Sequence, residues 1–252
     1  MSRSFFEWVG VILERYGTLF LTGTGNTMLI AISGTVLGFG LGLLVAVARG
    51  IKPAPRARFL SRALLAVLKS LLNIYIEVFR GTPMLVQAMV IYYGLQMFFG
   101  IKLEALTAGV FVVSINTGAY MAEIVRGGIL SVDVGQTEAA HSIGMSHWQT
   151  MTHVVLPQAI RNIMPALGNE FIVNIKDSCV LNVISVTELF FQARAAAGAT
   201  YRYFEVFFII GCIYLTLTFT VSRLLRMLER RMDGPASYTI HGSQSDVAKE
   251  GG

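Results

Sequence analysis

Charged residues are scarce in this sequence: only 14% of its 252 residues are Asp, Glu, Lys or Arg, whereas 54% are hydrophobic. A soluble globular domain carries roughly 25% charged residues. The low charge and a mean hydropathy of +0.62 exclude an ordinary soluble domain and indicate a protein that lies in lipid. The net charge of +5 does not indicate nucleic-acid binding, because Lys and Arg cluster beside apolar runs.

Cysteine and the common catalytic motifs are also scarce or absent. Cys179 and Cys212 both lie in apolar stretches, where a thiol acts as a small hydrophobic group, so we predict no disulfide and no metal site. The sequence lacks a Gly-x-x-x-x-Gly-Lys-Ser/Thr phosphate-binding loop and a His-Glu-x-x-His motif. We therefore predict no catalytic residue and no cofactor in this chain, and any ATP must be hydrolysed by another polypeptide.

Long apolar runs are the dominant feature of the sequence. A bilayer core about 30 Å thick needs roughly 20 apolar residues in a helix, and residues 28–48 meet this length without a charge. This run is too long for a cleaved signal peptide. The sequence predicts an all-α integral membrane protein with five transmembrane helices, at residues 24–48, 83–99, 105–125, 159–187 and 203–226.

Residues 57–80 are apolar enough to resemble a further span, but their polar residues share one helical face. These residues are Arg62, Lys69, Asn73, Glu77 and Arg80. A lipid-facing span would not tolerate such a stripe. We therefore predict an amphipathic helix at the cytoplasmic surface.

The positive charges predict the orientation of the chain. Arg and Lys residues follow the first predicted span and end the last one, whereas the opposite loops are nearly balanced in charge. The positive-inside rule then places the N-terminus outside and the C-terminus in the cytoplasm. We divide the chain into an extracytoplasmic segment at residues 1–22, a membrane domain at 23–231 and a cytoplasmic tail at 232–252, which is polar enough to be disordered.

A predicted cytoplasmic loop before the fourth span has the pattern of two short helices. Asp133 can cap the first helix, and Gly144 can supply the left-handed residue that ends it. Ser146 with Gln149 forms a capping box for the second helix. Pro157 is expected to interrupt the helical structure before the next span. A rigid pair of helices on a membrane face is suited to docking a partner.

This loop, at about residues 133–157, resembles the EAA loop of ABC importer permeases, including the spacing from the glycine to Leu-Pro. The matching residues are Glu138, Ala139, Ala140, Gly144, Leu156 and Pro157. The resemblance implies that the loop inserts into a cleft on an ATPase subunit, where small alanines allow close approach and Glu138 can pair with the partner. The loop departs from many relatives at Asp133-Val134, where they carry a proline and a basic residue.

A second signature, Arg80-Gly81-Thr82-Pro83, is similar to that of permeases for histidine, glutamine, glutamate, arginine and opines. Residues 119–129 and 168–178 look like that group too, and the resemblance covers residues 22–231. It implies a type I ABC importer permease for polar amino acids in a prokaryotic inner membrane. The implied partners are ATPase subunits that hold ATP and Mg, a second permease subunit, identical or paralogous, and an extracytoplasmic amino-acid-binding protein.

Polar residues within the predicted spans are costly, because an exposed charge in the bilayer costs roughly 2.5 to 3.5 kcal/mol on insertion scales. They either line the substrate path or form hydrogen bonds between helices. The candidates for the path are Asn116, Asn169, Glu170, Lys176 and Asp177. Gly34, Gly38, Gly40 and Gly42 instead indicate close helix packing.

Two other classes of membrane protein are considered. A secondary transporter driven by an ion gradient usually shows internal repeats or paired broken helices, and none is evident here. A membrane enzyme needs a convergent catalytic set, which the sequence does not provide. The identity of the transported amino acid is left open.

Overall fold

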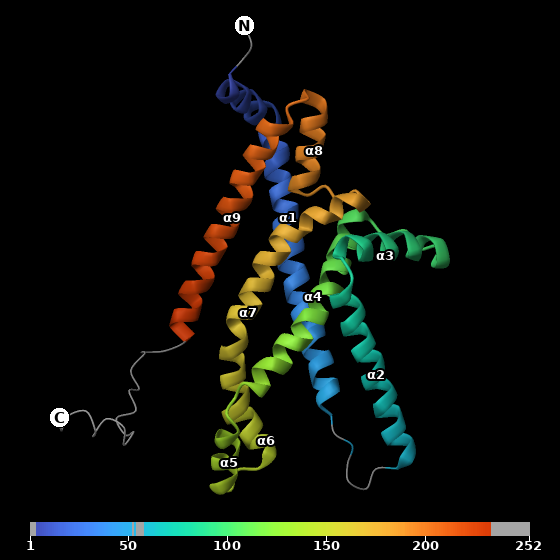
Figure 1. The fold of residues 1–252 in the computed structure, drawn as a ribbon, viewed down its shortest axis with the longest axis vertical. Coiled ribbons are helices and arrows are strands. Elements are labelled where there is room, and N and C mark those ends of the chain that lie inside the picture. Colours follow the sequence, from blue (N-terminus) through green and yellow to red (C-terminus); the bar gives the residue numbers. More distant parts are fainter. Residues whose placement is uncertain (1–3, 52, 54–57, 233–252) are drawn as a thin grey trace, which may run out of the picture.

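The structure is a computed structural model that describes residues 4–51, 53 and 58–232. The described chain is helical apart from short connections, which confirms the predicted all-α fold. Its elements are α1 (Phe5–Gly50), α2 (Phe59–Gly81), α3 (Met84–Phe99), α4 (Ala105–Leu130), α5 (Val134–Ser142), α6 (His147–Thr150), the π-helical turn η1 (Met151–Val155), α7 (Leu156–Asp177), the 3-10 helix η2 (Ser178–Ile184), α8 (Leu189–Thr200) and α9 (Tyr203–Met232) (Figure 1). The predicted tail lies outside the described residues, except for residue 232.

Helix α1 is 46 residues long, more than twice the length needed to cross a bilayer. It begins with a capping box in which the Ser4 amide donates to Glu7 Oε2 at 2.7 Å, so the segment predicted before residue 23 is part of the same helix from Phe5 onward. The first turns pack against α8 and α9, where Ile12 and Phe20 are buried. The N-terminal end of α1 is therefore held by two later helices.

The contact between α1 and α4 depends on glycines. A methyl group added at Gly34, Gly38 or Gly42 would lie 2.4, 2.7 or 2.4 Å from side-chain atoms of α4, closer than van der Waals contact permits. No atom lies within 4 Å of the corresponding position at Gly40. The prediction of close helix packing is confirmed for three of the four glycines, which let the two backbones approach.

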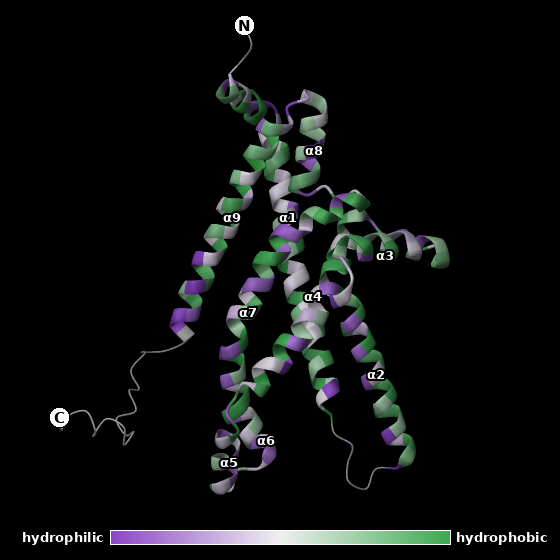
Figure 2. Ribbon diagram, viewed as in Figure 1, coloured by the Kyte–Doolittle hydropathy of each residue, from purple (hydrophilic) through white to green (hydrophobic). Residues whose placement is uncertain are grey.

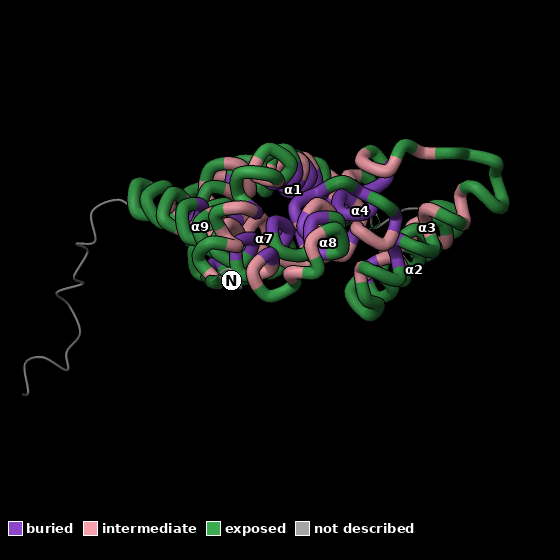
Figure 3. The backbone as a smooth tube through the Cα atoms, turned by 90° about the horizontal axis from the view of Figure 1, so that it is seen from above, coloured by how far each residue is buried: buried purple, intermediate pink, exposed green. Residues whose placement is uncertain are grey.

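A buried polar cluster joins α1, α4 and α7. Asn174 Nδ2 donates to Thr35 Oγ1 at 2.9 Å and to Thr117 Oγ1 at 3.0 Å, and all three side chains are buried. These bonds satisfy the amide inside an apolar bundle. Buried residues follow α1, α4, α7 and α8, whereas α2, α3 and α9 are largely exposed in the single chain (Figure 3).

Helix α2 is the second candidate membrane crossing, which contradicts the predicted surface helix at residues 57–80. Helix α2 has 23 residues and is long and apolar enough to span, whereas α3 has only 16. In Figure 1, α3 lies across the bundle rather than along it. The polar stripe is compatible with a span because Arg62 and Arg80 lie near its two ends, from which long side chains can reach water. Lys69 alone is charged near the middle of α2.

Five crossings remain the best account of the described residues. Helices α1, α2, α4 and α9 each pass the length and apolarity criteria, and a fifth crossing consists of residues 147–184 followed by α8 at a bend of 56°. Because α2 replaces α3, the number of spans and the predicted orientation stay the same. The end of α9 far from α8 is hydrophilic, consistent with its predicted cytoplasmic position (Figure 2).

Candidate functional site: the docking loop and the polar path

The predicted docking loop is built as the capping residues indicate. Asp133 Oδ1 accepts from the Gly135 amide at 2.6 Å and caps α5. Gly144 has a φ of +84°, the left-handed conformation predicted for it. Ser146 and Gln149 exchange the two hydrogen bonds of a capping box, at 2.8 and 3.3 Å. The two short helices lie together at one end of the molecule (Figure 1).

Pro157 does not interrupt the helix, which corrects our prediction. The helical path continues from α6 through the π-helical turn at Met151–Val155 into α7, with Pro157 in its first turn. The wider turn is closed by the Leu156 amide, which donates to the Met151 carbonyl. A π-helical turn accommodates the change in bonding before a proline, which lacks an N–H donor. The second docking helix and the α7 crossing are therefore one continuous rod.

The loop exposes apolar side chains beside its acidic residue. Ile143 and Trp148 are 78% and 74% exposed, and Val134 is also exposed. Glu138 is exposed with them. We call these four residues the docking patch. Sequence reasoning missed the three apolar members, although an isolated tryptophan in a polar loop is a signal for an interface.

The two alanines of the motif, Ala139 and Ala140, differ in their exposure. Ala139 is exposed, whereas Ala140 is buried within the loop. The loop is also joined firmly to the bundle, because Asn162 Nδ2 of α7 donates to Ser131 Oγ at 2.8 Å. A methyl group added at Gly128 of α4 would lie 2.1 Å from Ile163. The end of α4, the loop and the start of α7 thus form one packed unit.

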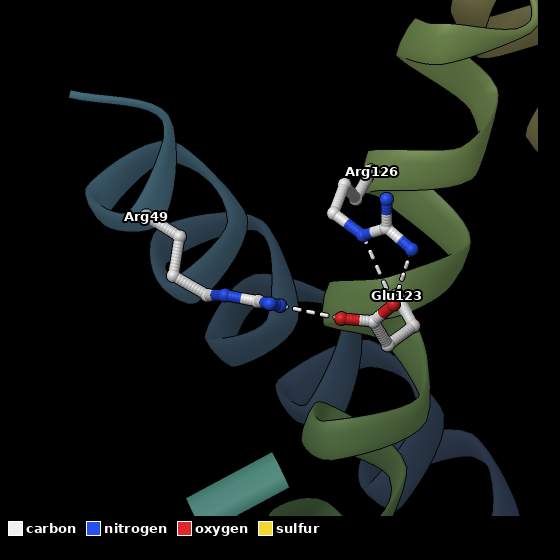
Figure 4. A network of polar contacts seen from close by, with 3 residues as sticks. All are labelled: Arg49, Glu123 and Arg126. Atoms are coloured by element: carbon white, nitrogen blue, oxygen red, sulfur yellow. Dashed lines mark hydrogen bonds and ion pairs between the residues drawn. The ribbon is translucent and has the colours of Figure 1, made fainter. Parts of the chain in front are cut away.

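An ion cluster fastens α1 to α4 close to this unit. Glu123 Oε2 accepts from Arg126 Nη2 at 2.7 Å and from Nε at 3.0 Å, while Oε1 pairs with Arg49 at the end of α1 (Figure 4). Glu123 and Arg49 are about 80% buried, at 19% and 23% exposed. Charge-assisted bonds of this kind are about twice as strong as neutral ones. The cluster therefore fixes the position of α1 relative to the helix that leads into the docking loop.

The Arg80-Gly81-Thr82-Pro83 signature forms the break between α2 and α3. The buried Gln87 holds this break, because its Nε2 donates to the carbonyls of Phe79 and Thr82, both at 2.9 Å. Gln87 Oε1 accepts from Asn116 Nδ2 at 2.9 Å. Asn116, predicted as a path residue, thus ties α4 to the break, a structural contact that single-sequence patterns do not reveal.

Two of the path candidates, Glu170 and Asp177, lie in the same region as Arg80 of the signature. Glu170 and Asp177 are seven residues apart on α7 and share one face. Asp177 and Arg80 are both close enough to Glu170 to act on its charge. The Arg80 guanidinium also lies 5.5 Å from the centre of the Tyr120 ring. A cation and two carboxylates from α2 and α7 therefore converge on the same region.

The other two candidates are placed differently. Asn169 lines a small pocket with Arg226 and Glu229 between α7 and α9, on another side of α7. Lys176 is exposed and makes none of the ion pairs found among the described residues. The structure therefore separates Asn169 from Glu170, whereas Lys176 lies beside Asp177 and is close enough to act on its charge.

Glu188 is a buried carboxylate that the sequence analysis did not single out. It is fully buried at the start of α8, and its oxygens accept from the amides of Phe190 and Phe191 at 2.9 and 2.6 Å. The Tyr214 hydroxyl of α9 donates to it at 3.1 Å. One side chain therefore caps α8 and links it to α9. Phe190 and Phe191 are near Glu188 in sequence, but Tyr214 is not, so only the fold reveals the link between α8 and α9.

We expect Glu188→Ala to lower the midpoint of thermal denaturation strongly, because it leaves two amides and a hydroxyl without their acceptor. The free energy of unfolding should fall by roughly 3 kcal/mol, since each unsatisfied buried group costs about 1 to 3 kcal/mol. Glu188→Gln keeps a carbonyl acceptor and should lose less. Denaturation of the purified protein in detergent, followed by size-exclusion chromatography, measures both. Glu14→Ala, at an exposed position, is the control; equal midpoints for Glu14→Ala and Glu188→Ala would contradict this role.

Comparison with known proteins identifies the family. Residues 57–234 match the family described as "Binding-protein-dependent transport system inner membrane component". The glutamine transport system permease protein GlnP of Escherichia coli K12 is 37% identical over 215 residues, which cover 85% of this chain and 93% of that protein. The probable amino-acid permease protein YxeN of Bacillus subtilis 168 is 42% identical over 171 residues, which cover 67% of this chain and 76% of that protein.

Solved structures agree with the sequence relatives. The crystal structure of an amino acid ABC transporter with histidines has a chain that matches with a TM-score of 0.79 and 43% identity, covering 92% of this chain and 100% of that one. An inward-facing structure of the MetNI methionine ABC transporter shares the fold, with a TM-score of 0.68 at 17% identity, covering 87% and 98% of the two chains. The chain therefore belongs to the family of binding-protein-dependent transport system inner membrane components, as a multi-pass permease subunit of an amino-acid ABC importer and not an enzyme.

Proposed function

We propose that this chain forms, with a second permease subunit, the inner-membrane path for polar amino acids and couples to an ATPase through the loop at residues 133–157. The observation that carries the proposal is the docking patch on a loop continuous with α7. ATP and Mg belong to the partner ATPase. An extracytoplasmic binding protein supplies the amino acid at the opposite face.

The docking patch has the composition of a protein interface. Exposed apolar side chains of the size of Trp148 and Ile143 are unfavourable in water and become favourable when a partner covers them. Glu138 adds a charge that a basic or amide group of the partner can bind. Gly144 sets the angle between the two helices that present these residues. A cleft in the ATPase that receives both helices at once accounts for all of these features.

The charged cluster on α2 and α7 has the chemistry that recognises a free amino acid. At neutral pH such a substrate carries an ammonium and a carboxylate. Glu170 and Asp177 can accept bonds from the ammonium, and Arg80 can bind the carboxylate as a planar fork. We therefore assign these three residues to the path and give Asn116 a supporting role through its bond to Gln87.

The polar face of α2 supports a second permease subunit. Asn73 and Glu77 are exposed in the single chain, on a helix whose other exposed residues are mostly apolar. Polar groups in a membrane-spanning helix face protein or a water-filled cavity rather than lipid. A second subunit around a shared axis covers this face and encloses the path between the two chains.

Reconstitution tests this function directly. The chain is co-expressed with its ATPase, purified and placed in proteoliposomes that contain ATP, and the binding protein is added outside with a radiolabelled polar amino acid. We expect uptake to require ATP, and ATP hydrolysis to rise when the loaded binding protein is present. Uptake driven by a proton or sodium gradient without ATP would show that the chain works as a secondary transporter.

A path substitution should separate transport from ATPase docking. We expect Glu170→Gln to lower amino-acid uptake by about tenfold or more, because a hydrogen bond to a charged group contributes about 1.5 to 3 kcal/mol. The ATPase should still co-purify. Asn169→Ala changes the neighbouring residue, which faces α9, and serves as the control. Equal uptake by Glu170→Gln and Asn169→Ala would show that Glu170 does not line the path.

A further inference from the structure

A groove between α1, α7 and α9 has no role in the transport scheme above. Its volume is about 320 Å³. Its walls include Ile32, Val36 and Phe39 of α1, Met164 and Leu167 of α7, and Leu225 of α9. The hydroxyl of Thr35, which also lines the groove, accepts a hydrogen bond from Asn174. The groove is therefore an almost wholly apolar surface.

The groove lies at membrane depth. Its α1 residues fall within the uncharged run at residues 28–48 that crosses the bilayer. Val36 and Ile32 are 64% and 50% exposed, so the groove opens toward the surroundings of the chain. An unfilled groove of this kind would lose dispersion contacts along its walls. A flexible hydrocarbon chain fits both the lining and the depth.

A positive charge stands beyond one end of the groove. Arg161 lies three residues before Met164 and seven before Gly168, so it shares the groove-lining face of α7. Arg161 is exposed and takes part in none of the three ion pairs among the described residues. It belongs to the first turns of α7, directly after the docking loop, and so to the predicted cytoplasmic end.

A second pocket, between α7 and α9, adjoins the groove and is lined by polar groups. Arg226, Asn169 and Ser222 line it, and Glu229 lines it as well. Gly168 and Leu225 line both the pocket and the groove, so polar and apolar surfaces meet at the α7–α9 contact. Glu229 and Arg226 line the same pocket, so their formal charges cancel there, and Arg161 is the better candidate to hold an anion.

We propose that the groove binds an acyl chain of an anionic phospholipid from the cytoplasmic leaflet, with the lipid phosphate at Arg161. An amphiphile of this kind matches an apolar channel that ends at an arginine near the membrane surface. Basic sites between transmembrane helices on the cytoplasmic side bind anionic headgroups in this way. A second permease chain would need no positive charge at this end, which favours the lipid as occupant.

Native mass spectrometry of the full importer complex tests the proposal. The complex is equilibrated in micelles that contain equal amounts of phosphatidylglycerol and phosphatidylcholine. We expect one retained phosphatidylglycerol for each permease chain, and a loss of about fivefold in Arg161→Gln, since one basic residue near the membrane surface is worth about 1 kcal/mol. Arg161→Lys should retain most of the binding. Arg58→Gln, the same charge change at the start of α2, is the control and should leave retention unchanged.

A second variant tests the acyl-chain part independently. Val36→Trp fills the groove from an exposed position and should reduce phosphatidylglycerol retention without loss of the ATPase. Equal retention of the two lipids, or equal effects of Arg161→Gln and Arg58→Gln, would overturn the proposal. So would efficient disulfide formation between two copies of Val36→Cys compared with the unsubstituted chain, because the groove would then be an interface between subunits.

Discussion

Gly38→Leu is expected to prevent α1 and α4 from packing and to abolish recovery of folded permease. A methyl group at this position already lies 2.7 Å from Thr117 Cβ and 3.1 Å from the Ser114 carbonyl oxygen, and leucine adds three more carbons. Overpacking typically costs 1 to 3 kcal/mol and occasionally more. The loss of stability in Gly38→Leu should reach or exceed the upper end of that range, because a displaced Thr117 would also lose its hydrogen bond with Asn174 of α7. Size-exclusion chromatography of the detergent extract measures the fraction of folded protein.

Gly40→Leu is the matched control for this substitution. It makes the same change two residues away on the same helix, at an exposed position with no atom within 4 Å of the added carbon. We expect normal recovery and uptake from this variant. Gly38→Ala should give an intermediate result. If Gly38→Leu and Gly40→Leu were recovered equally well, the close contact between α1 and α4 would not exist in the protein.

Gly144→Val is expected to separate the ATPase from a permease that still folds and inserts. Gly144 has a φ of +84°, which a β-branched residue adopts only at a cost on the order of 1 to 3 kcal/mol. The two docking helices would then take a different mutual angle, so Trp148 and Glu138 could not enter one cleft together. We expect loss of co-purifying ATPase and of ATP-driven uptake, measured on the same preparation.

Gly127→Val is the control for backbone strain. Gly127 is exposed near the end of α4 and has no atom within 4 Å of an added carbon. Its valine variant should keep the ATPase and transport normally. If Gly144→Val retained the ATPase and wild-type uptake while the affinity for the amino acid changed, the loop would belong to the substrate path rather than to coupling.

The features that could be predicted from the sequence depend on short-range spacing. The caps at Asp133 and Ser146 and the left-handed Gly144 involve partners within three residues, so local patterns are sufficient to identify them. The glycines of α1 could also be predicted, because their repeat of four residues indicates one helical face. Family resemblance extended these local signals to a function.

The features that could not be predicted depend on distant partners or on a missing neighbour. Gln87 and Asn116 are 29 residues apart, and Glu188 meets Tyr214 26 residues later, so nothing local marks these bonds. The polar stripe of α2 was misinterpreted for a different reason. A single sequence does not show which face of a span is covered by another subunit, so Lys69 and Glu77 were taken as evidence against a crossing.

The continuous path from His147 to Ile184 gives the permease a lever. At 1.5 Å per residue its 38 residues reach about 57 Å. The contact of Ile163 with Gly128 divides this path into a shorter arm that carries the docking helix and a longer arm that carries the carboxylates of Glu170 and Asp177. A tilt imposed on Trp148 by an ATPase would therefore swing those carboxylates in the opposite direction.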